Sequence, residues 1–504
     1  MTPAGVEGAE RSQKKFSLPA EYVMVPSFEL GKERGEFMRP IREILDARSV
    51  AVIGASRDPE KPGAQLLKVL KKVGYRGQVA GVNPQGGEVF ETPLYRSLEE
   101  VPFAVDLAVL HIPPRFIPAV LQDCVRKGVK GVVISAEGFA EIGAEGAKYQ
   151  EEVKSILRSS GMRGFGPNTL GLVNTATELT TSYYAGPRML RPGPIGFAAQ
   201  SGIFVGALLR YLSSFEGFQL SKGIGLGNKV DVNESDALSY LMEDEQTQII
   251  GMYLEDVKDG RRFLETAKQA VARKPVLLIK GGRTREGARA SASHTASMAM
   301  EDTIFEGAVR QAGILRLTGI DDFVRSLKGF LNMPLPRGGR LAFVTYSGAQ
   351  AIMSIDAATE QGLQVARLEE STRERIGRVI ATVSKINNPV DIFPDWLAHG
   401  FEKTTTEILG SLLKDKGVDG VIFISFANSG PEIYQPLADM LREERNKPVF
   451  FSILGAKKDI DVGQNFLEEH RIPCFDFPEM AVRVFAQMRK YAQIKDRLEA
   501  RGSG

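Results

Sequence analysis

The sequence predicts an α/β protein made of three successive units of parallel sheet and helix, and three observations lead to that fold class. From Ser49 onward, short β-rich apolar runs alternate with helical patterns at the spacing of a doubly wound parallel sheet. Two stretches rich in proline and glycine, residues 185–194 and 333–340, interrupt the alternation. The segments after these stretches open alike, which indicates an internal duplication of the fold.

The composition is that of a soluble globular chain. Its 504 residues are enough for three or four domains, since domains commonly span ~100–200 residues. The 64 Lys and Arg residues nearly balance the 62 Asp and Glu residues, so no overall basic field favours nucleic acid as a partner. The chain shows neither the apolar core of a signal peptide nor a run approaching ~20 apolar residues, so we expect a cytoplasmic location and no membrane partner.

The first unit begins after a segment without periodicity. Residues 1–45 are mixed in charge until MRPIREIL, and we interpret them as an N-terminal extension. The predicted strands of the unit lie in SVAVIGAS (49–56), QVAGVNP (78–84), DLAVLHIPP (106–114) and GVVISAEGF (131–139), and its helices in AQLLKVLKKV (64–73) and PAVLQDCVRKG (118–128). The loop 54–63 lacks the G-x-G-x-x-G spacing that lets a pyrophosphate touch the backbone, so NAD is disfavoured.

The second and third units open on the related segments PIGFAAQSGIFVGALL (194–209) and RLAFVTYSGAQAIMSI (340–355). Each reads as an apolar strand, a Ser-Gly turn and a helix of small residues. At the start of such a helix, unpaired backbone N–H groups and the positive end of the dipole converge on an anion. Ser201 and Ser347 are therefore candidates for phosphate binding, although Ser is also a common N-cap residue.

The sequence contains four histidines and two cysteines that could carry chemistry. His111 ends an apolar strand and His399 and His470 lie in loop-like contexts, so we expect structural or solvated roles for them. Cys124 and Cys474 lie in apolar contexts and match no metal-ligand or redox spacing, which indicates buried structural thiols.

His294 differs from the other histidines because small and hydroxyl residues surround it, in GGRTREGARASASHTASMAM (281–300). That loop leaves the imidazole room to admit a phosphate. A metal role is not expected, since no cluster with ligand spacing and no HExxH accompanies it. A nucleophile elbow, G-x-S-x-G, is absent as well. Acid–base chemistry and a phosphate-carrying nucleophile both remain open from the spacing alone.

The segment RASASHTASMA (289–299) resembles the Ser-His-Thr-Gly/Ala loop of nucleoside-diphosphate-forming acyl-CoA synthetases, relatives of succinyl-CoA synthetase. Further matches extend from about residue 46 to about residue 490 and include SVAVIGASRDPEKPG, VAGVNP, GPNTLGLVN, AAQSGIFVGAL, GLGNKVDVNESDALSYL, MYLEDVKDGRRFLE and NNPVDI. The resemblance implies a Rossmann-like CoA-binding domain (46–185) followed by two flavodoxin-like succinyl-CoA-ligase domains (190–333 and 337–495). The chain departs from the family at Thr169, often Cys, and at the turn 345–349, typically Thr-Asn-Ala/Ser-Gly-Gly.

The resemblance also implies roles for individual residues. His294 would accept the phosphoryl group, and Glu255 would hydrogen-bond its imidazole, although a charged Glu at a strand end can be merely solvated. Phosphate would meet the helix starts at Gln200, Ser201, Gly202, Ile203, Ser347 and Gly348. CoA would contact Gly54, Ser56, Arg57, Lys61, Asn83, Pro84, Pro113 and Glu137. The pair Asn83-Pro84 is also ordinary turn chemistry.

The implied reaction is acyl-CoA + NDP + phosphate ⇌ carboxylic acid + CoA + NTP, through an acyl phosphate and phosphohistidine. The sequence contains no P-loop, and the three units occupy residues 46 to 490, so we expect a partner subunit with an ATP-grasp domain that holds ADP or ATP with Mg, in a hetero-oligomer. Two alternatives are a non-catalytic CoA-binding regulatory protein, which the presence of His294 and Glu255 disfavours, and an NAD-dependent dehydrogenase, which the glycine spacing disfavours.

Overall fold

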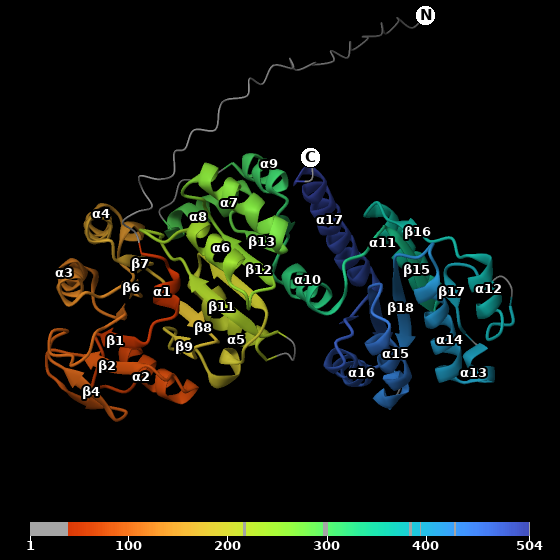
Figure 1. The fold of residues 1–504 in the computed structure, drawn as a ribbon, viewed down its shortest axis with the longest axis horizontal. Coiled ribbons are helices and arrows are strands. Elements are labelled where there is room, and N and C mark those ends of the chain that lie inside the picture. The colour runs from red at the N-terminus through yellow and green to blue at the C-terminus, as the bar shows by residue number, and fades with distance from the viewer. Residues whose placement is uncertain are drawn as a thin grey trace, which may run out of the picture. The chain divides into compact units, whose positions relative to one another are not determined.

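The computed structural model describes residues 39–214, 218–295, 301–382, 386–393, 395–427 and 430–502, and leaves out the side chains of residues 292–295 and 501–502. Its strands form three sheets, and helices flank each of them (Figure 1). Residues 1–38 of the predicted extension lie outside the described residues. The remainder of that extension contains the short helix α1 (Arg42–Leu45), with Ile44 and Leu45 buried.

The first sheet has the strand order β3-β4-β2-β1-β5-β6-β7. Its strands are β1 (Ser49–Ile53), β2 (Gln78–Val82), β3 (Gly87–Val89), β4 (Thr92–Tyr95), β5 (Leu107–Leu110), β6 (Gly131–Ile134) and β7 (Arg163–Phe165). The central strand β1 is parallel to both neighbours, β2 and β5, and is buried throughout its length. The predicted doubly wound arrangement is confirmed, and the edge hairpin β3–β4 is an addition to it.

The helices of the first unit are α2 (Pro62–Val73), α3 (Ile117–Lys127) and α4 (Ala144–Ser160), with 3₁₀ turns at η1 (Pro114–Phe116) and η2 (Ala140–Ile142). The helix α2 begins with Pro62 at its first position, where the missing N–H costs nothing, and ends at Gly74 in a left-handed conformation. Its apolar residues repeat at helical spacing and are buried against the sheet.

The second sheet has the order β14-β13-β12-β10-β11-β8-β9. Its strands are β8 (Leu172–Asn174), β9 (Leu179–Thr180), β10 (Ile195–Ala199), β11 (Leu220–Gly225), β12 (Ile249–Leu254), β13 (Val276–Lys280) and β14 (Leu315–Leu317). The chain enters this sheet at β8, which pairs antiparallel with β11, before the predicted boundary at residues 185–190. The reason is that the Pro- and Gly-rich stretch forms the 3₁₀ turn η3 (Pro187–Leu190) between strands of one sheet.

The helices of the second unit are the π-helix η4 (Phe204–Leu208), α5 (Leu209–Leu212), α6 (Glu234–Glu243), α7 (Gly260–Arg273), α8 (Arg285–Thr295), α9 (Asp302–Ala312) and α10 (Ile320–Asn332). The start of α6 is fixed by a capping box, in which Asn233 accepts from the backbone N–H of Asp236 and the Asp236 carboxylate accepts from that of Asn233. An ion pair between Arg163, in β7 of the first sheet, and Asp231, before α6 of the second unit, connects the two units; Arg163 Nε lies 2.9 Å from Asp231 Oδ2.

The third sheet has the order β16-β15-β18-β19-β20, with β17 paired to β15. Its strands are β15 (Arg340–Thr345), β16 (Gln364–Val365), β17 (Val390–Asp391), β18 (Gly420–Phe426), β19 (Val449–Leu454) and β20 (Cys474–Phe475). Its helices are α11 (Gly348–Glu360), α12 (Glu370–Ile376), α13 (Asp395–His399), α14 (Phe401–Lys414), the 3₁₀ turn η6 (Pro431–Tyr434), α15 (Gln435–Glu443), α16 (Lys457–Glu469) and α17 (Pro478–Gly502).

Cys124 and Cys474 are both buried free thiols, and burial raises the pKa of the Cys124 thiol to about 12. Both are therefore protonated and unreactive near neutral pH.

Among the helices of the described residues, none has the length and apolar character needed to cross a membrane.

Candidate binding and phosphoryl-transfer site

A pocket of about 1070 Å³ lies at the carboxyl ends of strands from the first and second sheets. This is the edge at which open α/β sheets bind ligands, where neighbouring connections run in opposite directions from the central strand. Ten of the residues predicted for the site line this one pocket. They are Gly54, Ser56, Lys61, Asn83, Pro113, Glu137, Gln200, Ser201, Gly202 and Ile203.

The floor of the pocket in the first sheet depends on Gly54. Its φ is +88°, and a Cβ at this position would lie 2.3 Å from the carbonyl oxygen of His111. Only glycine allows the chain to turn directly from β1 across the end of β5. The turn delivers Lys61, Pro62 and Gly63, at the start of α2, to the pocket wall. The free N–H groups and the dipole of this helix start favour an anion such as a diphosphate.

Two of the predicted CoA residues, Arg57 and Pro84, are not among the lining residues. The Arg57 guanidinium donates to the carbonyl oxygens of Gln85 and Gly86, at 2.7 and 2.8 Å, and so closes the turn after β2. Asn83 lines the pocket and also holds this turn, since its amide donates to the carbonyl of Ala55 at 2.7 Å. Asn83 therefore both stabilises a turn and lines the pocket.

His111 and Ser135 also line the pocket, at the ends of β5 and β6. Within the described residues, neither His111 Nε2 nor Ser135 Oγ has a hydrogen-bond partner, although both atoms are buried. Burial lowers the pKa of His111 to about 4, so its imidazole is neutral near pH 7. Buried polar groups usually have partners, so these two atoms are available to a bound ligand.

Gln200 holds the turn that follows β10. Its side-chain oxygen accepts from the backbone N–H groups of Glu255 and Asp256 at 2.9 and 3.1 Å, and its amide nitrogen donates to the Asp256 carboxylate at 2.7 Å. The Lys229 ammonium is fully buried beside it and lies 2.5 Å from Asp256 Oδ1 and 2.9 Å from Glu234 Oε2. These contacts fix the ends of β10 and β12 relative to one another, so the Ser201-Gly202 turn has a defined position.

Glu255 follows β12 and is nearly buried, with 8% of its surface exposed. Its carboxylate accepts from the Tyr253 hydroxyl at 3.2 Å and from the Ser291 hydroxyl at 3.3 Å. The glycine before α8 permits this approach, because a Cβ at Gly281 would lie 2.6 Å from the Tyr253 hydroxyl. The helix that bears His294 is therefore held against Glu255 through Ser291.

The side chain of His294 lies outside the described side chains, although its position falls within α8 (Arg285–Thr295). Ser347 and Gly348 begin α11 at the carboxyl end of β15, as predicted, but they do not line the pocket. The Ser347 side chain makes no capping hydrogen bond to α11.

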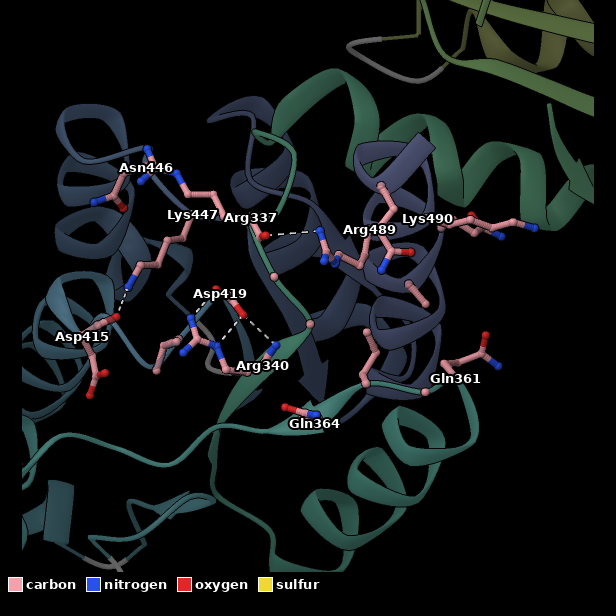
Figure 2. A pocket seen from close by; sticks show the side chains of 18 of the residues that line it. Arg337, Arg340, Gln361, Gln364, Asp415, Asp419, Asn446, Lys447, Arg489 and Lys490 are labelled. Atoms are coloured by element: carbon pink, nitrogen blue, oxygen red, sulfur yellow. Dashed lines mark hydrogen bonds and ion pairs between the residues drawn. The ribbon is translucent and has the colours of Figure 1, made fainter. Parts of the chain in front are cut away.

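A second cavity, of about 1120 Å³, lies at the amino-terminal ends of strands in the third sheet (Figure 2). It contains none of the predicted site residues. Arg340 and Asp419 form a bidentate pair there, with both side-chain N···O distances at 2.8 Å, and Lys447 donates to the carbonyl of Leu412 at 3.0 Å. Figure 2 shows Arg340 and Asp419 turned toward one another at the start of their strands. These pairs serve the fold of the third unit.

Sequence reasoning missed several residues of the first pocket, among them His111, Ser135, Tyr183, Tyr184 and Asn228. It also missed the buried Lys229, whose φ of +57° is unusual for a residue with a side chain. His111 and Ser135 could have been predicted as pocket residues, because they lie at the ends of predicted parallel strands.

The described residues hold no group of three or more His, Cys, Asp and Glu placed to bind a metal ion.

Comparisons with known proteins match this architecture. A family profile for a succinyl-CoA ligase-like flavodoxin domain matches residues 192–330, and one for a CoA binding domain matches residues 48–175. The chain is 35% identical over 468 residues to the alpha subunit of ADP-forming acetate–CoA ligase I from Pyrococcus furiosus, which covers 90% of this chain and 98% of that protein. Its identity to ADP-forming acetate–CoA ligase II from Archaeoglobus fulgidus is 36% over 465 residues, covering 92% of this chain and 68% of that protein.

Among solved structures, the chain is similar to the dinucleotide-forming acetyl-coenzyme A synthetase 1 from Ca. Korarchaeum cryptofilum, determined in complex with phosphate and ADP. The TM-score is 0.83 at 30% sequence identity, and the match covers 90% of this chain and 97% of that chain. The similarity therefore extends over most of the length of both chains.

Proposed function

This chain belongs to the family of ADP-forming acetate–CoA ligases and their alpha subunits, and from that premise we propose that it interconverts an acyl-CoA and a carboxylic acid with coupled phosphorylation of a nucleoside diphosphate. It is the CoA-binding, alpha-type part of an acid–thiol ligase of this family. The observation that carries the proposal is the single pocket in which the start of α2 and the Ser201-Gly202 turn face the same space.

In the first step, CoA lies across the carboxyl ends of β1, β2 and β5. Its diphosphate is held by the start of α2 and by Lys61, and the unpaired groups of His111 and Ser135 are placed to receive polar atoms of the ligand. A phosphate oxygen attacks the thioester carbonyl carbon and the carbon–sulfur bond breaks. The sulfur leaves with the proton of the phosphate, which gives acyl phosphate and CoA.

In the second step, an imidazole nitrogen of His294 attacks the phosphorus of the acyl phosphate. The bond between phosphorus and the acyl oxygen breaks, and the carboxylate leaves. The backbone N–H groups at Ser201, Gly202 and Ile203 stabilise negative charge on the transferred group. The Glu255 carboxylate, held by Tyr253 and Ser291, supports the positive charge that develops on the imidazole.

In the last step, the terminal phosphate oxygen of a nucleoside diphosphate attacks the phosphorus of phospho-His294, the phosphorus–nitrogen bond breaks, and the nucleoside triphosphate leaves. We propose that an ATP-grasp beta subunit brings the nucleotide and its Mg to this step, as the relatives named alpha subunits suggest. Ser347-Gly348 would supply a second helix start for the phosphoryl group in that assembly. A cytoplasmic location remains a prediction from the sequence.

His294 is tested by incubating the purified chain with an acyl-CoA and radiolabelled phosphate. We expect a label that is stable to base and labile to acid, as for phosphohistidine, and its absence in His294→Ala. Glu255→Gln should bind CoA unchanged but label more slowly by ~10²–10⁴-fold, the usual range for a positioned acid–base partner. Full labelling of His294→Ala would show that another residue carries the phosphate.

A further inference from the structure

The cavity of Figure 2, at the amino-terminal ends of strands in the third sheet, is strongly basic. Eight Lys and Arg residues line it, against two Asp and no Glu. The chain as a whole is nearly balanced, with 64 Lys and Arg and 62 Asp and Glu. Positive charge is therefore concentrated at this one place, where it creates a local potential that favours an anion.

Both aspartates of the cavity are occupied by contacts within the fold. The Asp419 carboxylate is bound by Arg340 in the bidentate pair described above. Asp415 is fully buried, and its two carboxylate oxygens accept from the backbone N–H groups of Gly417 at 2.7 Å and Glu369 at 2.9 Å. The acidic charge of the cavity is thus directed into the protein.

Four of the eight cations have partners within the protein, either in ion pairs or in hydrogen bonds to carbonyl oxygens: Arg316, Arg340, Lys414 and Lys447. The other four form no ion pair with any described residue: Arg337, Lys416, Arg489 and Lys490. We call this second group the unpaired cations. Like charges held close together repel one another, and a bound anion would relieve that repulsion.

The unpaired cations come from separate segments of the third unit. Arg337 precedes β15, Lys416 precedes β18, and Arg489 and Lys490 lie in α17. The Arg489 guanidinium donates to the backbone carbonyl of Arg337 at 3.2 Å, which holds α17 against the loop before β15 (Figure 2). One helix and two loops therefore bring positive charge to the same cavity.

The size and the remaining lining of the cavity indicate the kind of anion. Its volume of about 1120 Å³ is at the upper end of the range for small-molecule pockets, ~300–1,000 Å³, and far exceeds what a single phosphate fills. Five side-chain amides also line it, and each can donate and accept hydrogen bonds: Gln361, Gln364, Asn446, Gln487 and Gln493. Arg and Lys are the side chains that proteins use to bind phosphate groups. The balanced charge of the whole chain argues against an extended nucleic acid.

We propose that this cavity binds a small polyphosphate anion, whose phosphate groups contact the unpaired cations. The inference does not depend on the proposed CoA-dependent function, because the two sites use different residues. Ser347, the candidate phosphate residue of this unit, follows the carboxyl end of β15, whereas Arg337 precedes its amino end, and a strand of six residues spans ~20 Å. None of the described residues that line the cavity is a His, Cys or Ser, so the anion is bound there without being transferred.

The test is calorimetric titration of the purified chain with inorganic tripolyphosphate and with ATP, at 0.15 M salt so that weak surface attraction is screened. We expect dissociation constants of ~0.1 mM or lower. Equal affinities would show that the phosphates alone are recognised, and tighter binding of ATP would show that the amides contact the nucleoside. If neither anion binds, the proposal is overturned. Binding of an oligoglutamate peptide in place of both would assign the cavity to an acidic segment of a protein instead.

Variants locate the binding. Arg337→Gln combined with Arg489→Gln should weaken both anions ~10-fold or more, the contribution of a hydrogen bond to a charged group, and leave the affinity for CoA unchanged. Arg337→Gln alone, which removes no hydrogen bond between described residues, should weaken them ~3-fold or more and serves if the double variant is unstable.

Arg483→Gln is the matched control, because Arg483 is exposed in the same helix α17 but does not line the cavity. It should leave the affinities for tripolyphosphate and ATP unchanged. Equal weakening by the control, or anion binding that survives the loss of both Arg337 and Arg489, overturns the site.

Discussion

Among individual residues, Lys229 shows most clearly how the site is held. Its ammonium group is fully buried, and besides the ion pairs with Glu234 and Asp256 it donates to the Gln200 side-chain oxygen at 3.2 Å. A buried charge is tolerated only when it is paired and hydrogen-bonded. The cost of burying it is offset here by a network that fixes the Gln200 side chain and, through it, the backbone of Glu255.

The Asp256 carboxyl makes this network sensitive to acid. Burial alone would raise the pKa of Asp256, but the ammonium groups of Lys229 and Lys258 outweigh it and lower the pKa to about 2. An unfolded Asp has a pKa of about 3.9. A group with a lowered folded pKa stabilises the fold above the unfolded value, and this contribution, ~2 kcal/mol, is lost as the pH falls from ~4 to ~2.

We therefore expect Asp256→Asn to be less stable than the native chain at pH 7 by ~2 kcal/mol or more, and the difference to shrink toward pH 2. Urea unfolding at several pH values measures it. Lys258→Ala, which removes the more exposed of the two cations, should shift the free energy of unfolding by less than ~1 kcal/mol. A difference between Asp256→Asn and the native chain that is constant across this range contradicts the assignment.

At the scale of elements, the duplicated strand-turn-helix openings diverge after the turn. The second copy continues from Ser347 into the regular α-helix α11, whereas the first passes from Ser201 into the π-helix η4. The sequence predicts a helix in both places. In the first copy, Leu170 and Tyr184 lie close to Gly206 of the π-helix, and these residues precede it by more than twenty positions.

The strands of the third sheet are tied at their amino-terminal ends by Arg340 and Asp419, in the cavity of Figure 2. The Asp419 carboxylate accepts two hydrogen bonds from the Arg340 guanidinium and one from its backbone N–H, and Asp419 is 6% exposed. Asp419→Ala should therefore lower the free energy of unfolding by ~2–3 kcal/mol. CoA binding at the first pocket should be unaffected.

Lys490 is the matched control, because it lines the same cavity and makes no hydrogen bond or ion pair with the described residues. Lys490→Ala should shift the free energy of unfolding by ~0.5 kcal/mol or less. Thermal unfolding of the two variants beside the native chain gives the comparison. Equal destabilisation by both would show that the Arg340–Asp419 pair does not tie the strands.

For the whole molecule, the described part of the chain forms three sheets, and the proposed function places CoA and phosphate in the pocket between the first two of them. The P-loop pattern is absent from the sequence, and the described strands all belong to these three sheets. We therefore expect the isolated chain to bind CoA and to be phosphorylated from acyl-CoA and phosphate, but to exchange no phosphate with ATP.

Labelled ATP measures this directly. Transfer to the chain should appear only when a separately purified ATP-grasp subunit is added, and should then require an intact His294. Efficient labelling of the pure chain by ATP alone would reveal a nucleotide site within its own three units.

Particular residues show how much of the fold and of the candidate site the sequence predicts. The strands that precede Gly54 and Gln200 are predicted by apolar runs and turns, because burial in a parallel sheet leaves a local pattern. The roles of His294 and Glu255 came from the resemblance of their segments to a known family. The resemblance implies that Arg57 contacts CoA, but in the structure its guanidinium donates to the backbone after β2, a contact that depends on the path of the chain 28 and 29 residues later.

By itself, then, the sequence determined the α/β class, the Ser-Gly turns and the family, since these depend on local periodicity and on extended motifs. Only the tertiary structure decided that β8 and β9 join the second sheet and that His111, Ser135, Tyr184 and Ile203 share one pocket with Lys61. The physical reason is that a pocket at the ends of parallel strands is assembled by strand order. Strand order results from packing between residues far apart in the chain, and the local alternation of apolar and polar residues does not encode it.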